Sequence, residues 1–269
     1  MTRPPRADRA RRRPPFIVLA AATLGLALFV LPLVGLLQRA AWGSLLDDLR
    51  DPASIEALRL SLVTSLTATA LALVLGLPLA WLLARSDLPG RAVVGALVLL
   101  PMVLPPVVGG VALLSAFSRR SPLGGWLYDA LGIQLTFSPA GVVLAETFVA
   151  LPFFVLTVEA ALRQADVRYE QLAATLGARR ATVFRRVTLP AIAPAVGAGA
   201  VLAWARALGE FGATITFAGN IAGRTRTLPL AVYLALESNP DAAIALSLVL
   251  LAVSFVVLVA LRDRWIGRT

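Results

Sequence analysis

The sequence predicts an all-α membrane protein with about six transmembrane helices. Its 269 residues are 58% hydrophobic and 15% charged, whereas soluble domains are about 45–50% apolar and about 25% charged. The charges are also clustered, because the runs 16–37, 60–84, 92–118 and 242–261 contain none. Each run is long enough for the ~20 residues that cross a bilayer. This composition argues against a soluble enzyme.

Six segments are expected to span the membrane, namely 16–37, 60–83, 92–116, 139–162, 194–218 and 242–261. A cleaved signal peptide is an alternative for the first. Its apolar core would be about 7–15 residues long, but this run has 22, so we expect an uncleaved span. Two further apolar pieces, 123–137 and 227–236, are too broken or too short to cross and predict short helices or re-entrant segments on the outer side.

The distribution of arginine predicts the orientation. Six spans put both termini on one side of the membrane, and 17 of the 25 arginines lie there, against seven on the other side. Arginine near spans favours the cytoplasm. We therefore expect a cytoplasmic tail over 1–15, a single transmembrane domain over 16–262 with a cytoplasmic loop at about 163–190, and a cytoplasmic tail over 263–269.

Several residue types are absent, and this limits the chemistry. The chain has no Cys, no His and no Lys, so disulfides, Cys/His zinc sites, imidazole catalysis and the lysine of a Walker A loop are excluded. We expect no catalytic residue, metal or cofactor in this chain, and any ATP must be bound by another chain. The net charge of +10 does not require a nucleic acid partner, because arginine beside spans explains it.

The loop 163–190 predicts a helix, a turn and a second helix outside the membrane. Asp166 can cap the first helix, and Gly177 can adopt the left-handed backbone that ends it. The second helix carries apolar residues such as Phe184 among arginines until Pro190 stops or redirects the chain. From these features alone, an amphipathic element on anionic lipid is an open alternative.

The order of residues in this loop resembles the "EAA" loop of permease subunits of ATP-binding-cassette (ABC) importers. Gly177 is followed after nine residues by a Val-x-Leu-Pro run, as in the family pattern. The first half of the pattern differs, because Gln171 stands at the position of its glutamate and Leu172 at that of its first alanine, and Glu170 lies one position earlier. The resemblance implies a type I importer permease whose loop docks in a groove on an ATPase subunit. It assigns this coupling role to Glu170, Ala173, Ala174, Gly177, Phe184, Leu189 and Pro190.

Two other stretches, 100–109 and 205–220 with 225–230, resemble the permeases for tetrahedral oxyanions and favour molybdate, with tungstate as a close relative. A sulfate or thiosulfate permease of the same family is the alternative. Residues expected along the translocation path or at a gate are Pro101, Pro105, Pro106, Arg206, Glu210, Phe211 and Thr214. Arg206 and Glu210 are four residues apart and predict an ion pair within the membrane. The prolines are equally consistent with an ordinary packing kink.

The resemblance implies alternating access in a bacterial inner membrane. The expected partners are a second copy of the chain, two ATPase subunits that bind ATP and Mg, an extracytoplasmic oxyanion-binding protein and the lipid bilayer, but no nucleic acid. Two other classes remain as alternatives. An ion-coupled secondary transporter would leave the loop unexplained, and a membrane-embedded lipid-processing enzyme would need a catalytic set that the sequence does not display.

Overall fold

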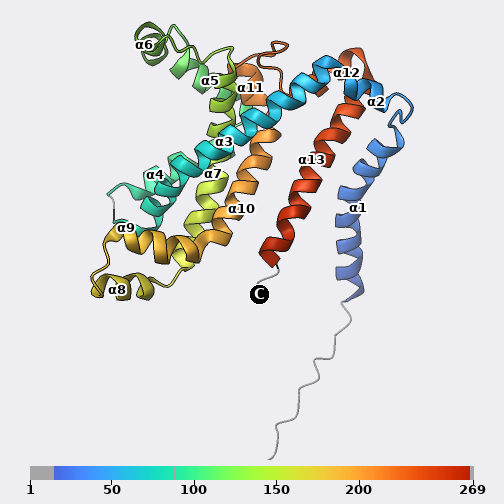
Figure 1. The fold of residues 1–269 in the computed structure, drawn as a ribbon. Helices are drawn as coiled ribbons and strands as arrows, with labels where there is room; N and C mark the ends of the chain where they lie inside the picture. The colour runs from blue at the N-terminus through green and yellow to red at the C-terminus, as the bar shows by residue number, and fades with distance from the viewer. Residues whose placement is uncertain (1–14, 88, 267–269) are drawn as a thin grey trace, which may run out of the picture.

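The computed structural model describes residues 15–87 and 89–266, and within them the fold is all-α, as predicted (Figure 1). The arginine-rich segment 1–14 and residues 267–269 lie outside the described residues. The helices are α1 (Phe16–Gln38), α2 (Leu45–Arg50), α3 (Pro52–Arg85), α4 (Arg91–Val103), α5 (Pro106–Phe117), α6 (Pro122–Leu131), α7 (Pro139–Gln164), α8 (Val167–Thr175), α9 (Arg180–Val183), the π-helical turn η1 (Phe184–Thr188), α10 (Leu189–Leu208), α11 (Gly212–Phe217), α12 (Leu228–Ser238) and α13 (Pro240–Ile266).

Within residues 15–87 and 89–266, five helical stretches are long and apolar enough to cross a membrane, and the bent pair α4–α5 makes six when it is counted as one broken span. Four of the predicted spans match α1, α3, α7 and α13, although α3 starts at Pro52 rather than at residue 60. Its additional residues are capped by Asp51, whose side chain accepts a hydrogen bond from the backbone N–H of Ser54. The charged residues Glu56 and Arg59 thus lie in a helix that extends beyond the uncharged run.

The third predicted span is broken. Helices α4 and α5 meet at Leu104 and Pro105 with a bend of 119°. Helices α3 and α7 run parallel, because their C-terminal ends are joined by hydrogen bonds from Arg85 to the Ala165 carbonyl and from Arg163 to the Leu83 carbonyl. The chain must therefore return to the opposite end of the bundle between them, and α4 and α5 make that crossing.

The fifth predicted span, 194–218, is wrong at both ends. Its helical run begins earlier, at Arg180, and α10 ends at Leu208. Residues 209–211 leave the helix, and the short helix α11 follows. At this break the side chain of Glu210, one residue before the N-cap residue Phe211, accepts a hydrogen bond from the backbone N–H of Ala213 in the first turn of α11.

The core lies where α3 packs on α7 and α10. One face of α3 carries small buried residues at intervals of about four, namely Ala57, Ser61, Ser65, Ala68, Ala72, Gly76 and Ala80. Such a stripe lets helices approach closely. Phe154 of α7 fills the space beside it, because a methyl group added to Gly76 would lie 2.6 Å from its ring and one added to Gly199 of α10 would lie 3.1 Å away.

The two short apolar pieces form α6 and α12, as expected, and neither crosses the bundle. Ser61 of α3 accepts a hydrogen bond of 2.6 Å from the backbone N–H of Leu228 and so fixes the start of α12. In Figure 1 both helices lie at the end opposite α8 and α9. Helix α1 stands beside α13 and buries none of its residues within the chain, which suits an apolar helix that faces lipid.

Candidate functional site

The coupling segment, residues 163–190, has the predicted first helix, with a defined cap at each end. The Asp166 side chain accepts a hydrogen bond of 2.9 Å from the backbone N–H of Arg168 at the start of α8. At the end, Gly177 has a φ of +83°. The N–H groups of Gly177 and Ala178 donate to the carbonyls of Ala174 and Ala173 at 3.0 and 3.1 Å. These two bonds form a Schellman motif, which requires the left-handed residue.

The second helix continues into the membrane. We expected Pro190 to stop or redirect the chain, but α9, the π-helical turn η1 and α10 form one helical run from Arg180 to Leu208. Pro190 sits in the first turn of α10, directly after η1. A π-helical turn before it accommodates a residue that cannot donate a backbone hydrogen bond. In Figure 1 the run crosses the lower end of the bundle at α9 and turns upward at α10.

Three exposed apolar side chains lie on α8 and its C-cap residue, which the sequence analysis missed, and one of them, Tyr169, also lines the pocket between α8 and the bundle. Tyr169, Leu172 and Leu176 have exposed fractions of 64%, 60% and 88%. Their spacing of three and four residues places them on one side of a helix. We call these three residues the apolar face of α8. Ala174 is exposed and Ala173 is half-buried, so the helix also presents little bulk near its C-terminal end.

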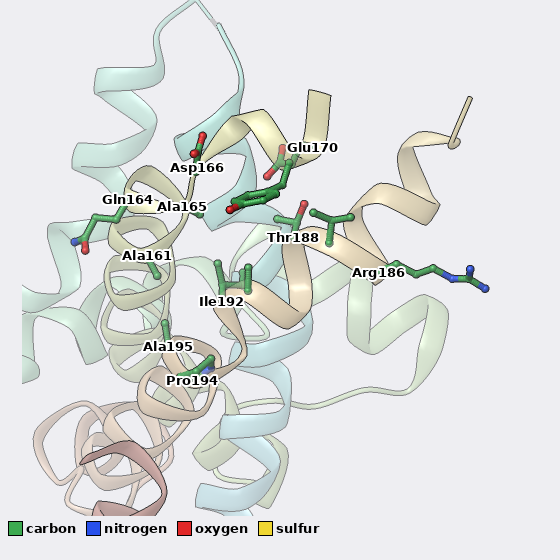
Figure 2. A pocket seen from close by; sticks show the side chains of 13 residues that line it. Ala161, Gln164, Ala165, Asp166, Glu170, Arg186, Thr188, Ile192, Pro194 and Ala195 are labelled. Carbon is green, nitrogen blue, oxygen red and sulfur yellow. The ribbon is translucent and has the colours of Figure 1, made fainter. Parts of the chain in front are cut away.

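A pocket of about 660 Å³ lies behind α8, between the coupling segment and helices α7 and α10 (Figure 2). Ala161 and Gln164 line it from α7, and Ile192 and Ala195 line it from α10. The side chain of Arg186 extends away from it in Figure 2. A second pocket of about 430 Å³ separates α8 from α3 and includes Phe184. Pockets therefore separate α8 from the bundle on two sides.

Glu170 bridges this space. Its Oε1 accepts a hydrogen bond of 3.3 Å from Nη2 of Arg85, the last residue of α3. Both side chains are largely shielded, with exposed fractions of 21% and 12%. The sequence analysis selected Glu170 from the family pattern but missed Arg85. The two residues are 85 positions apart, so no local spacing could reveal the contact.

The two helix breaks meet at the other end of the molecule. Pro105 and Pro106 open α5, and Pro101 lies inside α4. A methyl group added to Gly212, the first residue of α11, would lie 2.8 Å from Cβ of Pro106. A methyl group added to Gly110 of α5 would lie 2.9 Å from the Ala213 carbonyl oxygen. The interruptions of the third and fifth spans thus pack against each other through small residues.

The predicted pair of Arg206 and Glu210 forms at this junction. Nη1 of Arg206 lies 2.6 Å from Oε2 of Glu210. The Glu210 side chain is buried and its other oxygen accepts the N–H of Ala213 at 2.7 Å, whereas Arg206 is 26% exposed. Both carboxylate oxygens of Glu210 therefore have a polar partner. Of the other predicted path residues, Thr214 is buried, and the ring of Phe211 contacts that of Tyr233, with centroids 5.1 Å apart and planes tilted by 51°.

A second buried carboxylate lies in α7. Oε1 of Glu146 accepts a hydrogen bond of 2.9 Å from the hydroxyl of Thr64 in α3. Its exposed fraction is 1%, and Oε2 has no partner among the residues that the structure describes. This bond joins the two parallel helices far from the arginines at their ends. No local spacing could reveal this contact, because Thr64 and Glu146 are 82 positions apart.

Comparisons with known proteins agree with this architecture. Residues 72–268 match the family model described as "binding-protein-dependent transport system inner membrane component". The molybdenum transport system permease protein ModB of Mycobacterium tuberculosis is 50% identical over 245 residues, which cover 90% of this chain and 92% of the relative. The sulfate transport system permease protein CysT of Salmonella typhimurium is 38% identical, with 86% and 84% covered.

The crystal structure of a bacterial ABC transporter involved in the import of alginate, at 18% identity, has the same fold, with a TM-score of 0.74 over 94% of this chain and 96% of that one. The prediction of a multi-pass permease that is a transport component and not an enzyme is thereby confirmed. By its matched length, its identity to these relatives and its fold, the chain belongs to the family of inner membrane components of binding-protein-dependent transport systems.

Proposed function

We propose that this chain is the membrane permease subunit of an ATP-driven importer for molybdate, working by alternating access. The relative named for molybdenum transport shares more identity with it than the relative named for sulfate transport, 50% against 38%. Molybdate and tungstate are both tetrahedral dianions, so tungstate is expected to compete. The apolar face of α8 is the observation that carries the coupling part of the proposal.

The apolar face fits a groove on an ATPase subunit. An amphipathic helix that lays such a face into a groove uses residues at spacings of three, four and seven, and Tyr169, Leu172 and Leu176 have these spacings. An exposed leucine with an 88% exposed fraction is stabilised when a partner covers it. Because the chain has no Lys, the partner supplies the Walker A loop and holds ATP and Mg.

The complete assembly contains two copies of this chain, two ATPase subunits and an extracytoplasmic oxyanion-binding protein. The excess of arginine beside α8 favours a cytoplasmic position for the coupling segment and both termini. Closure of the ATPases on ATP would draw the two coupling segments together and open the outer side, and hydrolysis would reverse the motion. The Arg206–Glu210 pair would lie along the path, where the carboxylate offsets an arginine that would otherwise retain a dianion.

The test is reconstitution in liposomes with a molybdate-transport ATPase and an oxyanion-binding protein from the same organism. We expect ATP-dependent uptake of labelled molybdate, competed by unlabelled tungstate and only weakly by sulfate. An ATPase variant that lacks its Walker A lysine is the matched control and should abolish uptake. Equal competition by sulfate would refute the molybdate assignment, and uptake without ATP would refute ATP coupling.

A Leu172→Asp variant tests the apolar face itself. The carboxylate would have to enter an apolar groove without a partner, which is unfavourable, so the ATPase should no longer co-purify. Thr175→Asp adds the same charge on the same exposed helix, outside the apolar face, and serves as the control. Equal loss of the ATPase in both variants would contradict docking through this face.

A further inference from the structure

We infer that Arg85 is a positioning residue that ties the coupling helix α8 to the transmembrane helices α3 and α7. The inference rests on the proposed coupling role of α8 and adds the link through which α8 moves the bundle. Arg85 ends α3, and its Nη2 donates to two acceptors. One is the Ala165 carbonyl at the end of α7, at 3.1 Å, and the other is Oε1 of Glu170 in α8, at 3.3 Å.

The link is part of a reciprocal arrangement of two arginines. Arg163 in the last turn of α7 donates from Nη2 to the Leu83 carbonyl in the last turn of α3, at 3.3 Å. Arg85 in the last turn of α3 donates to the carbonyl that follows α7. The last carbonyls of a helix lack intrahelical donors and carry partial negative charge. Each arginine therefore donates a hydrogen bond to a carbonyl at the C-terminal end of the other helix, and these bonds hold the two ends together.

Only Arg85 extends this arrangement to α8. Arg163 forms its ion pair with Glu159 of its own helix, whereas Arg85 pairs with Glu170 across 85 residues. Arg85 is the more shielded arginine, with an exposed fraction of 12% against 46%. Charged hydrogen bonds are stronger when water is excluded. The Arg85 contact is thus the one at this end that is placed to resist a pull on α8.

The surroundings of α8 make this contact important. Pockets of about 660 and 430 Å³ lie on two sides of the helix. Glu170 and Thr188 line both pockets, and Figure 2 shows Glu170 at the edge of the first one. The Arg85–Glu170 ion pair spans this gap, so removing it should leave α8 held by its contacts with α9 and η1 and by its chain connections.

The experiment measures coupling and local order separately. We expect Arg85→Gln and Glu170→Gln to lower the number of molybdate ions transported per ATP hydrolysed by about tenfold, the factor that corresponds to losing one charge-assisted hydrogen bond, while ATP hydrolysis continues. Arg91→Gln is the matched control, because Arg91 begins α4 at the far end of the connection that follows Arg85, and among the described residues it donates to the Ser86 carbonyl, at 3.5 Å. The Arg85→Gln/Glu170→Gln double variant should be no worse than Arg85→Gln alone.

Amide hydrogen exchange of the full chain in lipid nanodiscs tests the contact without transport. Exchange across Val167–Thr175 should be faster in Arg85→Gln and Glu170→Gln and unchanged in Arg91→Gln. Unchanged exchange in both variants, or a transport ratio within twofold of the unmodified protein, would overturn the inference. Failure of the unmodified protein to transport molybdate would refute the proposed function alone, because the exchange result stands independently. If Arg85→Gln does not insert in the membrane, Glu170→Gln decides.

Discussion

Replacing Gly177 by valine tests whether the shape of the coupling segment controls ATPase docking. Gly177 has a φ of +83°, and no atom lies within 4 Å of a Cβ added there, apart from its own chain neighbours. Crowding is therefore excluded as a cause of any effect. What remains is the cost of a left-handed backbone for an L-residue, about 1–2 kcal/mol, which bears hardest on a β-branched side chain.

The expected effect follows from this cost. Valine would favour a backbone that breaks the Schellman bonds from Gly177 and Ala178 to the end of α8. The docking-competent shape of the loop would then be less populated, and 1–2 kcal/mol corresponds to a factor of about 5–30 in that population. The apparent affinity for the ATPase falls by the same factor, because only the competent state binds.

Titration of the partner ATPase onto the permease in lipid nanodiscs measures this affinity. Gly177→Asn is the matched control, since asparagine adds a side chain but tolerates the left-handed region. We expect the asparagine variant to bind close to the unmodified protein and the valine variant to bind about 5–30-fold more weakly. Equal affinities for all three proteins would refute the reasoning, and so would equal losses for both variants.

Three other predictions follow from the structure. A single cysteine introduced at Thr175 should be protected from an impermeant thiol reagent in intact cells, whereas one introduced at Asn239 should react. Labelling at position 175 would show that the proposed topology is inverted. Alanine variants of Arg206 and Glu210 should show a coupling energy of about 0.5–3 kcal/mol in a double-mutant cycle on stability, whereas additive effects would mean that the ion pair contributes nothing. Gly212→Ala should destabilise the protein by about 1–3 kcal/mol, seen as a lower Tm, because the new methyl group would overlap the proline that opens α5; an unchanged Tm would contradict this packing.

The fold could be predicted from the sequence where the signal is local. Uncharged runs of about 20 residues identify the long helices, and Asp166 and Gly177 mark the ends of α8 because caps depend on a few adjacent residues. The prediction was wrong for the span 194–218. The uncharged residues before Arg206 and after Glu210 suggested one continuous helix. There the chain leaves the helix at residues 209–211, and Glu210 accepts a hydrogen bond from the backbone N–H of Ala213 in α11. Hydropathy cannot show from which backbone N–H a carboxylate accepts.

The candidate site was predicted only in part, for a similar reason. The pair of Arg206 and Glu210 followed from their spacing. The contacts of Arg85 with Glu170 and of Thr64 with Glu146 join residues more than 80 positions apart, and composition and periodicity carry no information on such pairs. The helical spacing of Tyr169, Leu172 and Leu176 can be read from the sequence, but their exposure depends on which other elements pack against α8.

The long-range contacts also explain how a displacement at one end could reach the other. Helices α3 and α7 are joined by the arginines at their C-terminal ends and, within the bundle, by the bond between Thr64 and Glu146. Two parallel helices fixed at two heights cannot slide past each other without breaking polar bonds in a setting where replacement partners are scarce. They therefore move as one body. Helix α11 packs on α7 through Phe217, so motion of this body carries the helix break and its ion pair with it.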